Sequence, residues 1–163
     1  MSVIFSSVDA LVGDLRRRLG GASIVGIDGW TGVGKTTLAQ RLASELHGAA
    51  YDLDSALTHD LKVYISAIRL EEIAQAVADA PGILFVSGVC LREILKRAEI
   101  QADAHIYVKR MASWGWSDED EMAGQGVAEI PGASGEFLRA EMRQYHGQWR
   151  PHQIADYEFH RFD

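Results

Sequence analysis

The sequence has little cysteine, no long hydrophobic run and no excess of basic residues. Cys90 is its one cysteine, so the 163-residue chain cannot form an internal disulfide, which fits a reducing compartment. The longest mostly apolar run, residues 82–91, contains Ser87 and is far shorter than the about 20 residues that span a bilayer. These absences exclude a disulfide-stapled scaffold and a transmembrane helix.

The charge balance excludes a further class of function. The chain has 23 acidic residues against 16 basic ones, a formal net charge of −7. Nonspecific nucleic-acid binding needs a general positive field, which this chain does not have. Residues 1–10 include Asp9 and no Lys or Arg, unlike a secretory signal peptide. We therefore expect a cytoplasmic protein that binds neither nucleic acid nor membrane.

What is present is the composition of a folded globular protein. Hydrophobic residues make up 47% of the chain and charged residues 24%, close to the averages for soluble domains. The sequence contains no repeat, low-complexity tract or recognisable linker. We expect a single domain over residues 1–163.

Short apolar runs alternate with segments of helical periodicity. The predicted strands are residues 22–28, 49–53, 83–86, 104–108 and 155–159. The predicted helices are residues 8–19, 35–47, two pieces within 55–80, 91–98 and 134–150. Residues 111–133, with weak periodicity and the acid run 118–121, are expected to be irregular. The alternation predicts βαβ units and a parallel sheet of the α/β class.

The clearest motif is Gly-Trp-Thr-Gly-Val-Gly-Lys-Thr-Thr at residues 29–37, which satisfies G-x-x-x-x-G-K-[ST] without deviation. Glycines allow positive φ angles and a close approach of backbone N–H groups to phosphate oxygens. The helix that follows directs free N–H groups and its positive dipole end at the same anion. The predicted nucleotide-binding residues are Gly29, Trp30, Thr31, Gly32, Val33, Gly34, Lys35, Thr36 and Thr37.

Two side chains of the motif have separate predicted roles. Lys35 would place its ammonium group on the β- and γ-phosphates, and the Thr36 hydroxyl would ligate Mg²⁺. The alternative is a glycine-rich turn that matches by chance, at roughly the half-per-cent level for a random chain of this size. The motif follows a predicted strand and opens a predicted helix, as a phosphate-binding loop requires. The sequence therefore predicts ATP and Mg²⁺ as ligands.

Residues 24–39 resemble the opening of the uridine kinase-like P-loop kinases, a group that includes phosphoribulokinase and bacterial pantothenate kinase. The shared pattern is a strand that ends in Ile27-Asp28-Gly29 and a loop in which Thr31 stands where the group usually has Ser. Residues 145–157 look like the group's segment before the last strand, with Tyr145, Pro151 and Ala155-Asp156-Tyr157 in corresponding places.

The resemblance implies both a fold and an activity. The fold would be the three-layer P-loop NTPase fold, with five parallel strands in the order 2-3-1-4-5, helices on both faces and ligands at the carboxyl ends of the strands. The activity would be that of a small-molecule kinase, which transfers the γ-phosphoryl group of ATP to a hydroxyl of a nucleoside or another small metabolite.

A kinase of this group needs a carboxylate after the second strand to accept the proton of the substrate hydroxyl. Asp52 and Asp54 stand there, and Asp54 matches the group's position best. The resemblance implies that Asp54 is catalytic and that it holds the metal together with Thr36. The alternative is that Asp54 only caps the next helix, with Ser55 as a competing cap.

The sequence departs from the group at two points. Ser87-Gly88 follows the third strand where the group usually has Glu-Gly, so a carboxylate for the metal would have to come from Asp52 or Asp54. Related kinases close arginines over the phosphoryl group after the fourth strand, where this chain has its acid run. The remaining candidates are Arg110, Arg139, Arg143 and Arg150, each of which could equally be a solvated surface arginine. Arg143, which could share a helix face with Arg139, is the predicted catalytic arginine.

Two functions of different classes are compatible with these residues. One is a kinase in which Lys35, Asp54 and Arg143 are catalytic, with a nucleoside triphosphate and a small hydroxyl acceptor as its partners. The other is a catalytically weak nucleotide-binding module that acts through a partner, which Ser87 and the acid run favour. The acceptor, the preferred base and the oligomeric state do not follow from the sequence.

Overall fold

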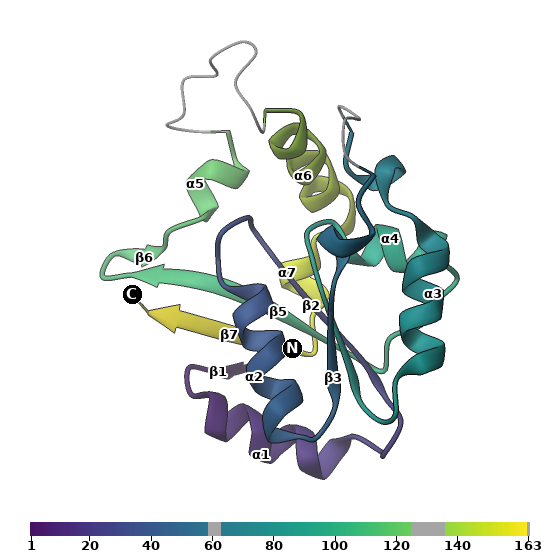
Figure 1. The fold of residues 1–163 in the computed structure, drawn as a ribbon. Helices are drawn as coiled ribbons and strands as arrows, with labels where there is room; N and C mark the ends of the chain where they lie inside the picture. Colours follow the sequence, from purple (N-terminus) through teal and green to yellow (C-terminus); the bar gives the residue numbers. More distant parts are fainter. Residues whose placement is uncertain (59–62, 125–135, 163) are drawn as a thin grey trace.

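A parallel sheet forms the centre of the fold in the computed structural model, which describes residues 1–58, 63–124 and 136–162 (Figure 1). Within these residues the sheet has seven strands in the order β1-β7-β5-β2-β4-β3, and β6 pairs with β5 outside this path. The strands are β1 (Val3–Phe5), β2 (Ile24–Gly29), β3 (Ala49–Asp52), β4 (Leu84–Ser87), β5 (Ala104–Ala112), β6 (Gly115–Trp116) and β7 (Tyr157–Phe162). Every pair is parallel except the β5–β6 hairpin.

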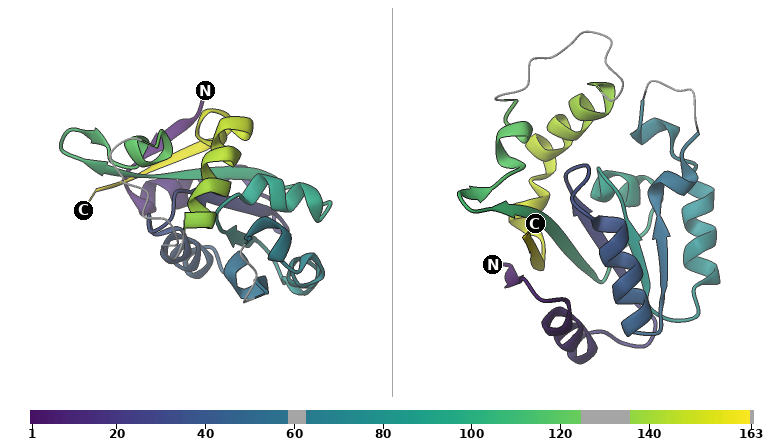
Figure 2. Two further views of the ribbon diagram at one scale, coloured as in Figure 1. Left: turned by 90° about the horizontal axis from the view of Figure 1, so that it is seen from above. Right: turned by 60° about the vertical axis from the view of Figure 1, so that its left-hand side comes forward.

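Helices cover both faces of this sheet (Figures 1 and 2). The α-helices are α1 (Val8–Arg18), α2 (Lys35–Glu45), α3 (Leu70–Asp79), α4 (Leu91–Arg97), α5 (Glu119–Met122), α6 (Glu136–Trp149) and α7 (Pro151–Ile154). Two 3₁₀ turns, η1 (Leu53–Ala56) and η2 (Ile65–Ala67), follow β3. Helix α2 packs on β3 and β4, whereas α4 and α7 contact β2 from the other side.

The central strands are buried because helices cover them from both sides. In β4 every residue is buried, and in β2 every residue after Ile24 is buried. Val25, Ile27 and Phe85 have no exposed surface. These strands are apolar without alternation, which is the pattern of a parallel sheet covered on two faces.

The predicted α/β class, the parallel sheet and the helices on both faces are confirmed. The predicted count of five strands and the strand order for the whole sheet were wrong, because β1 adds an edge beside β7 and β6 adds a short hairpin on β5. The five predicted strands lie side by side within the larger sheet as β3-β4-β2-β5-β7. The missed strand β1 is only Val-Ile-Phe, too short for a periodicity argument to detect.

The irregular segments differ from the prediction in detail. Within the predicted irregular stretch, β5 continues to Ala112 and turns back into β6, and the acid run forms most of α5. The segment 55–80 contains η2 and α3, and residues 59–62 of it lie outside the described residues. The helix predicted at residue 134 is described from Glu136. In the described part of the chain, no helix has both the length and the hydropathy to cross a membrane.

Candidate functional site

The phosphate-loop motif lies at the carboxyl end of β2 and leads directly into α2 (Figure 1). A cavity of about 180 Å³ opens beside it. The loop and α2 contribute Thr31, Lys35 and Thr36, β3 and η1 contribute Asp52 and Asp54, and α6 contributes Leu138. The carboxyl ends of parallel strands are where open α/β sheets bind their ligands.

The loop takes conformations that its glycines allow. Gly34, immediately before α2, has φ +92°, and Gly29, at the end of β2, has φ +151°. An ideal Cβ on Gly29 would lie 2.7 Å from the backbone oxygen of Val108 on the neighbouring strand. Both φ angles lie in the region that favours glycine, and at Gly29 a side chain would also collide with the neighbouring backbone. The turn from β2 into α2 therefore requires glycine at both positions.

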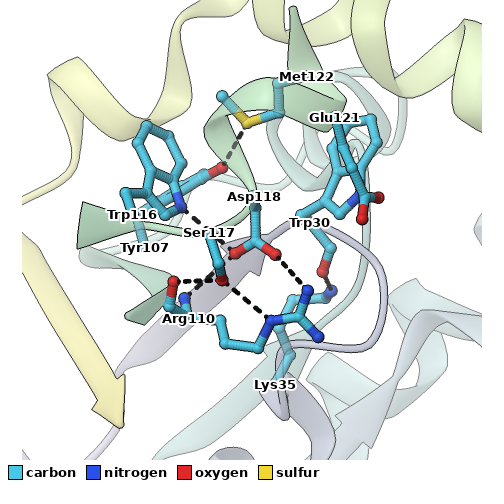
Figure 3. A network of polar contacts seen from close by, with 9 residues as sticks. All are labelled: Trp30, Lys35, Tyr107, Arg110, Trp116, Ser117, Asp118, Glu121 and Met122. Atoms are coloured by element: carbon cyan, nitrogen blue, oxygen red, sulfur yellow. Dashed lines mark hydrogen bonds and ion pairs between the residues drawn. The ribbon is translucent and has the colours of Figure 1, made fainter. Parts of the chain in front are cut away.

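Lys35 lies inside the loop with only 8% of its surface exposed. Its ammonium group donates a hydrogen bond to the backbone oxygen of Trp30, which closes the loop around the side chain (Figure 3). Burial lowers the pKa of Lys35 to about 8, although the carboxylates of Asp28 and Asp54 oppose this shift. The loop therefore holds a cation at its centre, as a polyphosphate site requires.

Asp28, the last residue before the loop, ties the loop to α6. It is 2% exposed, and its Oδ1 accepts a hydrogen bond of 2.8 Å from the Gly29 N–H. Its Oδ2 accepts a hydrogen bond from the Tyr145 hydroxyl. The Tyr145 oxygen in turn accepts a hydrogen bond from the backbone N–H of Arg92. Burial raises the pKa of Asp28 from 3.8 to about 6, against the lowering effect of these donors.

The raised pKa of Asp28 predicts a pH-dependent cost in stability. The pKa of Asp28 is higher in the folded state than in the unfolded state, so the protonated carboxyl favours folding. This stabilising contribution to the free energy of unfolding is complete below pH 3.8 and is lost as the pH rises through about 6. Asp28→Asn has no such titration. Relative to the wild type, its free energy of unfolding should therefore increase by about 2 kcal/mol between about pH 4.5 and pH 7.5. Urea unfolding at both pH values checks this, and an equal difference at both would contradict it.

Asp52, the last residue of β3, and Asp54, in η1, have different partners. Asp52 accepts the hydroxyl of Thr36 at 2.8 Å through Oδ2 and the backbone N–H of Asp54 at 3.0 Å through Oδ1. Asp52, not Asp54, is thus the cap of the following turn, which is η1 rather than an α-helix. Asp54 accepts the hydroxyl of Tyr64 at 2.7 Å. Both acids line the cavity, and the contact with Thr36 belongs to Asp52.

Ser87 lies beside Asp52 at the end of β4. The two residues are paired in the sheet, so their side chains share one face. The Ser87 side chain is buried, and its hydroxyl oxygen has no hydrogen-bond partner within the described residues. An unpaired buried hydroxyl is costly in a folded protein unless a water or ligand satisfies it. Ser87 and Asp52 thus carry oxygen atoms on one face of the sheet, and Asp52 also binds the Thr36 hydroxyl. Oxygen atoms are the ligand type that Mg²⁺ takes in proteins.

Two residues of the acid run, Asp118 and Glu121, bind partners in the fold, and Glu121 binds the phosphate loop. Trp30 is 1% exposed, and its indole N–H donates a hydrogen bond of 2.8 Å to Glu121 on α5 (Figure 3). The Trp30 ring packs edge-on against His146 on α6. Asp118 is fully buried and pairs with Arg110 at 3.2 Å. Two of the four acids are thus engaged by partners inside the fold, a use that composition alone does not reveal.

The four arginines considered from the sequence do not line the cavity beside the loop. Arg110 pairs with Asp118, and Arg143 donates 3.0 Å to the backbone oxygen of Glu121. Arg150 has φ +47° and caps α7, and the Nε atom of Arg139 is buried. Sequence reasoning missed Arg161 on β7, whose guanidinium lies over Gly34 of the loop. The predicted strand ended at Phe159, before this residue.

Comparison with protein-family models and with curated proteins found no match. Among solved structures, a proposed fructose transport system kinase from Silicibacter sp. TM1040 is similar, with TM-score 0.48, 15% identity, 96% of this chain and 98% of that one covered. Shikimate kinase from Bacteroides thetaiotaomicron is also similar, with TM-score 0.43, 17% identity, 85% of this chain and 86% of that one covered. Both proteins are named as kinases. Because the TM-scores and identities are low, the function proposed below rests on this chain's own residues.

Proposed function

We propose that the chain is an ATP-dependent phosphotransferase that moves the γ-phosphoryl group to a hydroxyl of a nucleoside or another small metabolite. The observation that carries this proposal is the meeting of Lys35, Thr36, Asp52 and Asp54 around one cavity at the carboxyl edge of the sheet. A phosphate-loop cation and an acid near the same pocket are the parts that phosphoryl transfer to a hydroxyl needs.

The loop residues bind and orient the triphosphate. The backbone N–H groups at the start of α2 and the ammonium of Lys35 face the polyphosphate and balance its charge. The loop keeps its form because Asp28 binds the Gly29 N–H and Trp30 is anchored by Glu121. A preformed cradle of this kind requires little reorganisation when the phosphoryl group acquires charge in the transition state.

The donors around Thr36 fit Mg²⁺. Thr36 and Asp54 were expected to hold the metal, and we propose two additional groups: Asp52, which binds the Thr36 hydroxyl, and the Ser87 hydroxyl, which has no hydrogen-bond partner within the described residues. Mg²⁺ in such sites is held by one or two carboxylates plus substrate phosphates, so a protein-only cage is not needed. When bound, the ion would neutralise charge on the phosphate oxygens.

Asp54 is the residue that we propose to accept the proton of the acceptor hydroxyl. It is exposed on the cavity wall, and the Tyr64 hydroxyl fixes the orientation of its carboxylate. Asp52 has its two oxygens engaged by Thr36 and by the Asp54 N–H, which suits it to positioning the metal-side hydroxyl instead. Asp54 is thus the proposed proton acceptor, and Asp52 is the proposed carboxylate that positions the Thr36 hydroxyl for the metal.

An acceptor screen tests this function. The protein is incubated with ATP, Mg²⁺ and a panel of nucleosides, sugars and other hydroxyl metabolites, and ADP release is measured against a reaction without acceptor. We expect at least one acceptor to raise ADP release well above that background. ATP binding by calorimetry with no acceptor effect across the panel would instead favour the second function below.

A nucleotide-binding module that acts through a partner is the second candidate. The observation in its favour is that Ser87 stands where an acid is expected and that Arg110 and Arg143 are bonded to the acid segment rather than placed on the cavity. In this case the loop would bind ATP in the same way, and no acceptor would increase its consumption.

A further inference from the structure

A second cavity lies on the other side of the loop. It measures about 620 Å³ and is walled by α2, the end of β7 and the turn between β1 and α1. Gly34 lines both this cavity and the smaller one beside Asp52 and Asp54. Gly34 is therefore a residue that the two cavities share.

Arg161 lines the larger cavity and lies against Gly34, the residue that both cavities share. An ideal Cβ on Gly34 would lie 2.7 Å from its Nη1 atom, 3.5 Å from its Cζ atom and 3.6 Å from its Cδ atom. The guanidinium thus takes the space that a side chain at residue 34 would fill, directly over the backbone of the phosphate loop. Arg161 reaches this point because β7 runs parallel to β5 as far as Phe162, which carries the strand past the level of the loop.

We infer that Arg161 binds the α-phosphate of the nucleotide and that the nucleoside part occupies the 620 Å³ cavity, an inference that rests on the proposed function. The smaller cavity, with Lys35 and the two acids, takes the end of the triphosphate where transfer occurs. The phosphate beside Gly34 and Arg161 is then the one nearest the nucleoside. The volume of the larger cavity lies within the about 300–1,000 Å³ of small-molecule pockets.

The chemistry of arginine suits this position. A guanidinium presents a rigid fork of donors that binds two phosphate oxygens together, which a lysine cannot do. The other arginine on this cavity, Arg41, is 58% exposed and lies 3.8 Å from Asp9. Among the arginines of the described residues that line either cavity, Arg161 is the one that lies against the loop itself.

The experiment is calorimetric titration of the full chain with a nucleoside triphosphate, diphosphate, monophosphate and the free nucleoside. ATP and GTP are both tried, and the series with the tighter triphosphate is used. We expect Arg161→Ala to weaken binding of all three phosphorylated ligands by about tenfold to a hundredfold and to leave the affinity for the free nucleoside unchanged. Arg161→Lys should recover only part of the loss. Arg97→Ala, which removes an exposed arginine paired with Glu93, is the matched control.

The outcomes separate this inference from the proposed function. If the wild type binds neither triphosphate, the proposed function fails and the inference fails with it. If the wild type binds and Arg161→Ala binds equally well, the inference alone is overturned. Loss of triphosphate affinity with unchanged diphosphate and monophosphate affinity would place Arg161 on the γ-phosphate and also overturn it. A loss that includes the free nucleoside, with a lowered melting temperature, would indicate a structural role instead.

Discussion

Replacing Lys35 with alanine is expected to slow acceptor-dependent phosphoryl transfer by about a hundredfold to a thousandfold at saturating ATP. The ammonium group is buried at the centre of the loop, so it acts on the phosphate charge with little screening by water. Among the residues that the structure describes, no other lysine lines the cavity to replace it. The rate of ADP formation with the acceptor found in the screen measures the effect.

Two further variants make the result for Lys35 specific. Lys35→Met keeps most of the side-chain volume without the charge and should be as slow as Lys35→Ala, provided that its melting temperature shows a folded chain. Lys96→Ala, which removes a lysine from α4 that packs on Trp149, should transfer at the wild-type rate. A folded Lys35→Met variant with the wild-type rate would contradict the assigned role.

Replacing Asp54 with asparagine is expected to slow the transfer by about a hundredfold to ten-thousandfold while ATP affinity stays within about twofold of the wild type. Asparagine keeps the shape and can still accept the Tyr64 hydroxyl, but it cannot take a proton from the acceptor. The measurement is the transfer rate at saturating ATP and acceptor, combined with calorimetry of ATP binding.

The neighbouring acid provides a contrast for Asp54. Asp52→Asn should raise the Mg²⁺ concentration needed for half-maximal rate, because Asp52 holds the Thr36 hydroxyl. Asp79→Asn, at an exposed aspartate that accepts from Gln75 on α3, should change neither quantity. An Asp54→Asn variant that transfers at the wild-type rate would leave Asp54 as an orienting residue and would remove it from the proposed mechanism.

Most of the fold could be predicted from the sequence because its signals are local sequence patterns. The apolar runs of β2 and β4 and the helix after the loop were visible because burial on both faces imposes a continuous apolar pattern. Strand β1 was missed because three residues carry no period and its pairing with β7 joins the two ends of the chain. The hairpin strand β6 was missed because it has only two residues.

The site was less accessible to sequence reasoning than the loop motif itself. Residues 29–37 can be recognised as a phosphate-binding loop from their composition and spacing, because the φ angles of this turn favour glycine. The contact of Asp52 with Thr36 depends on how β3 lies beside β4. The position of Arg161 depends on the register between β5 and β7. Such pairings are set by tertiary packing, so a single sequence could give the acids as candidates but not their separate partners.

Calorimetry with ATP on the wild type and on Lys35→Ala tests most directly whether the loop at residues 29–37 grips a polyphosphate. We predict that the wild type binds ATP and that Lys35→Ala binds it about tenfold to a hundredfold more weakly, in line with the loss of a charged hydrogen-bond donor from a buried site. An identical dissociation constant for the two proteins, both shown to be folded, would contradict the account.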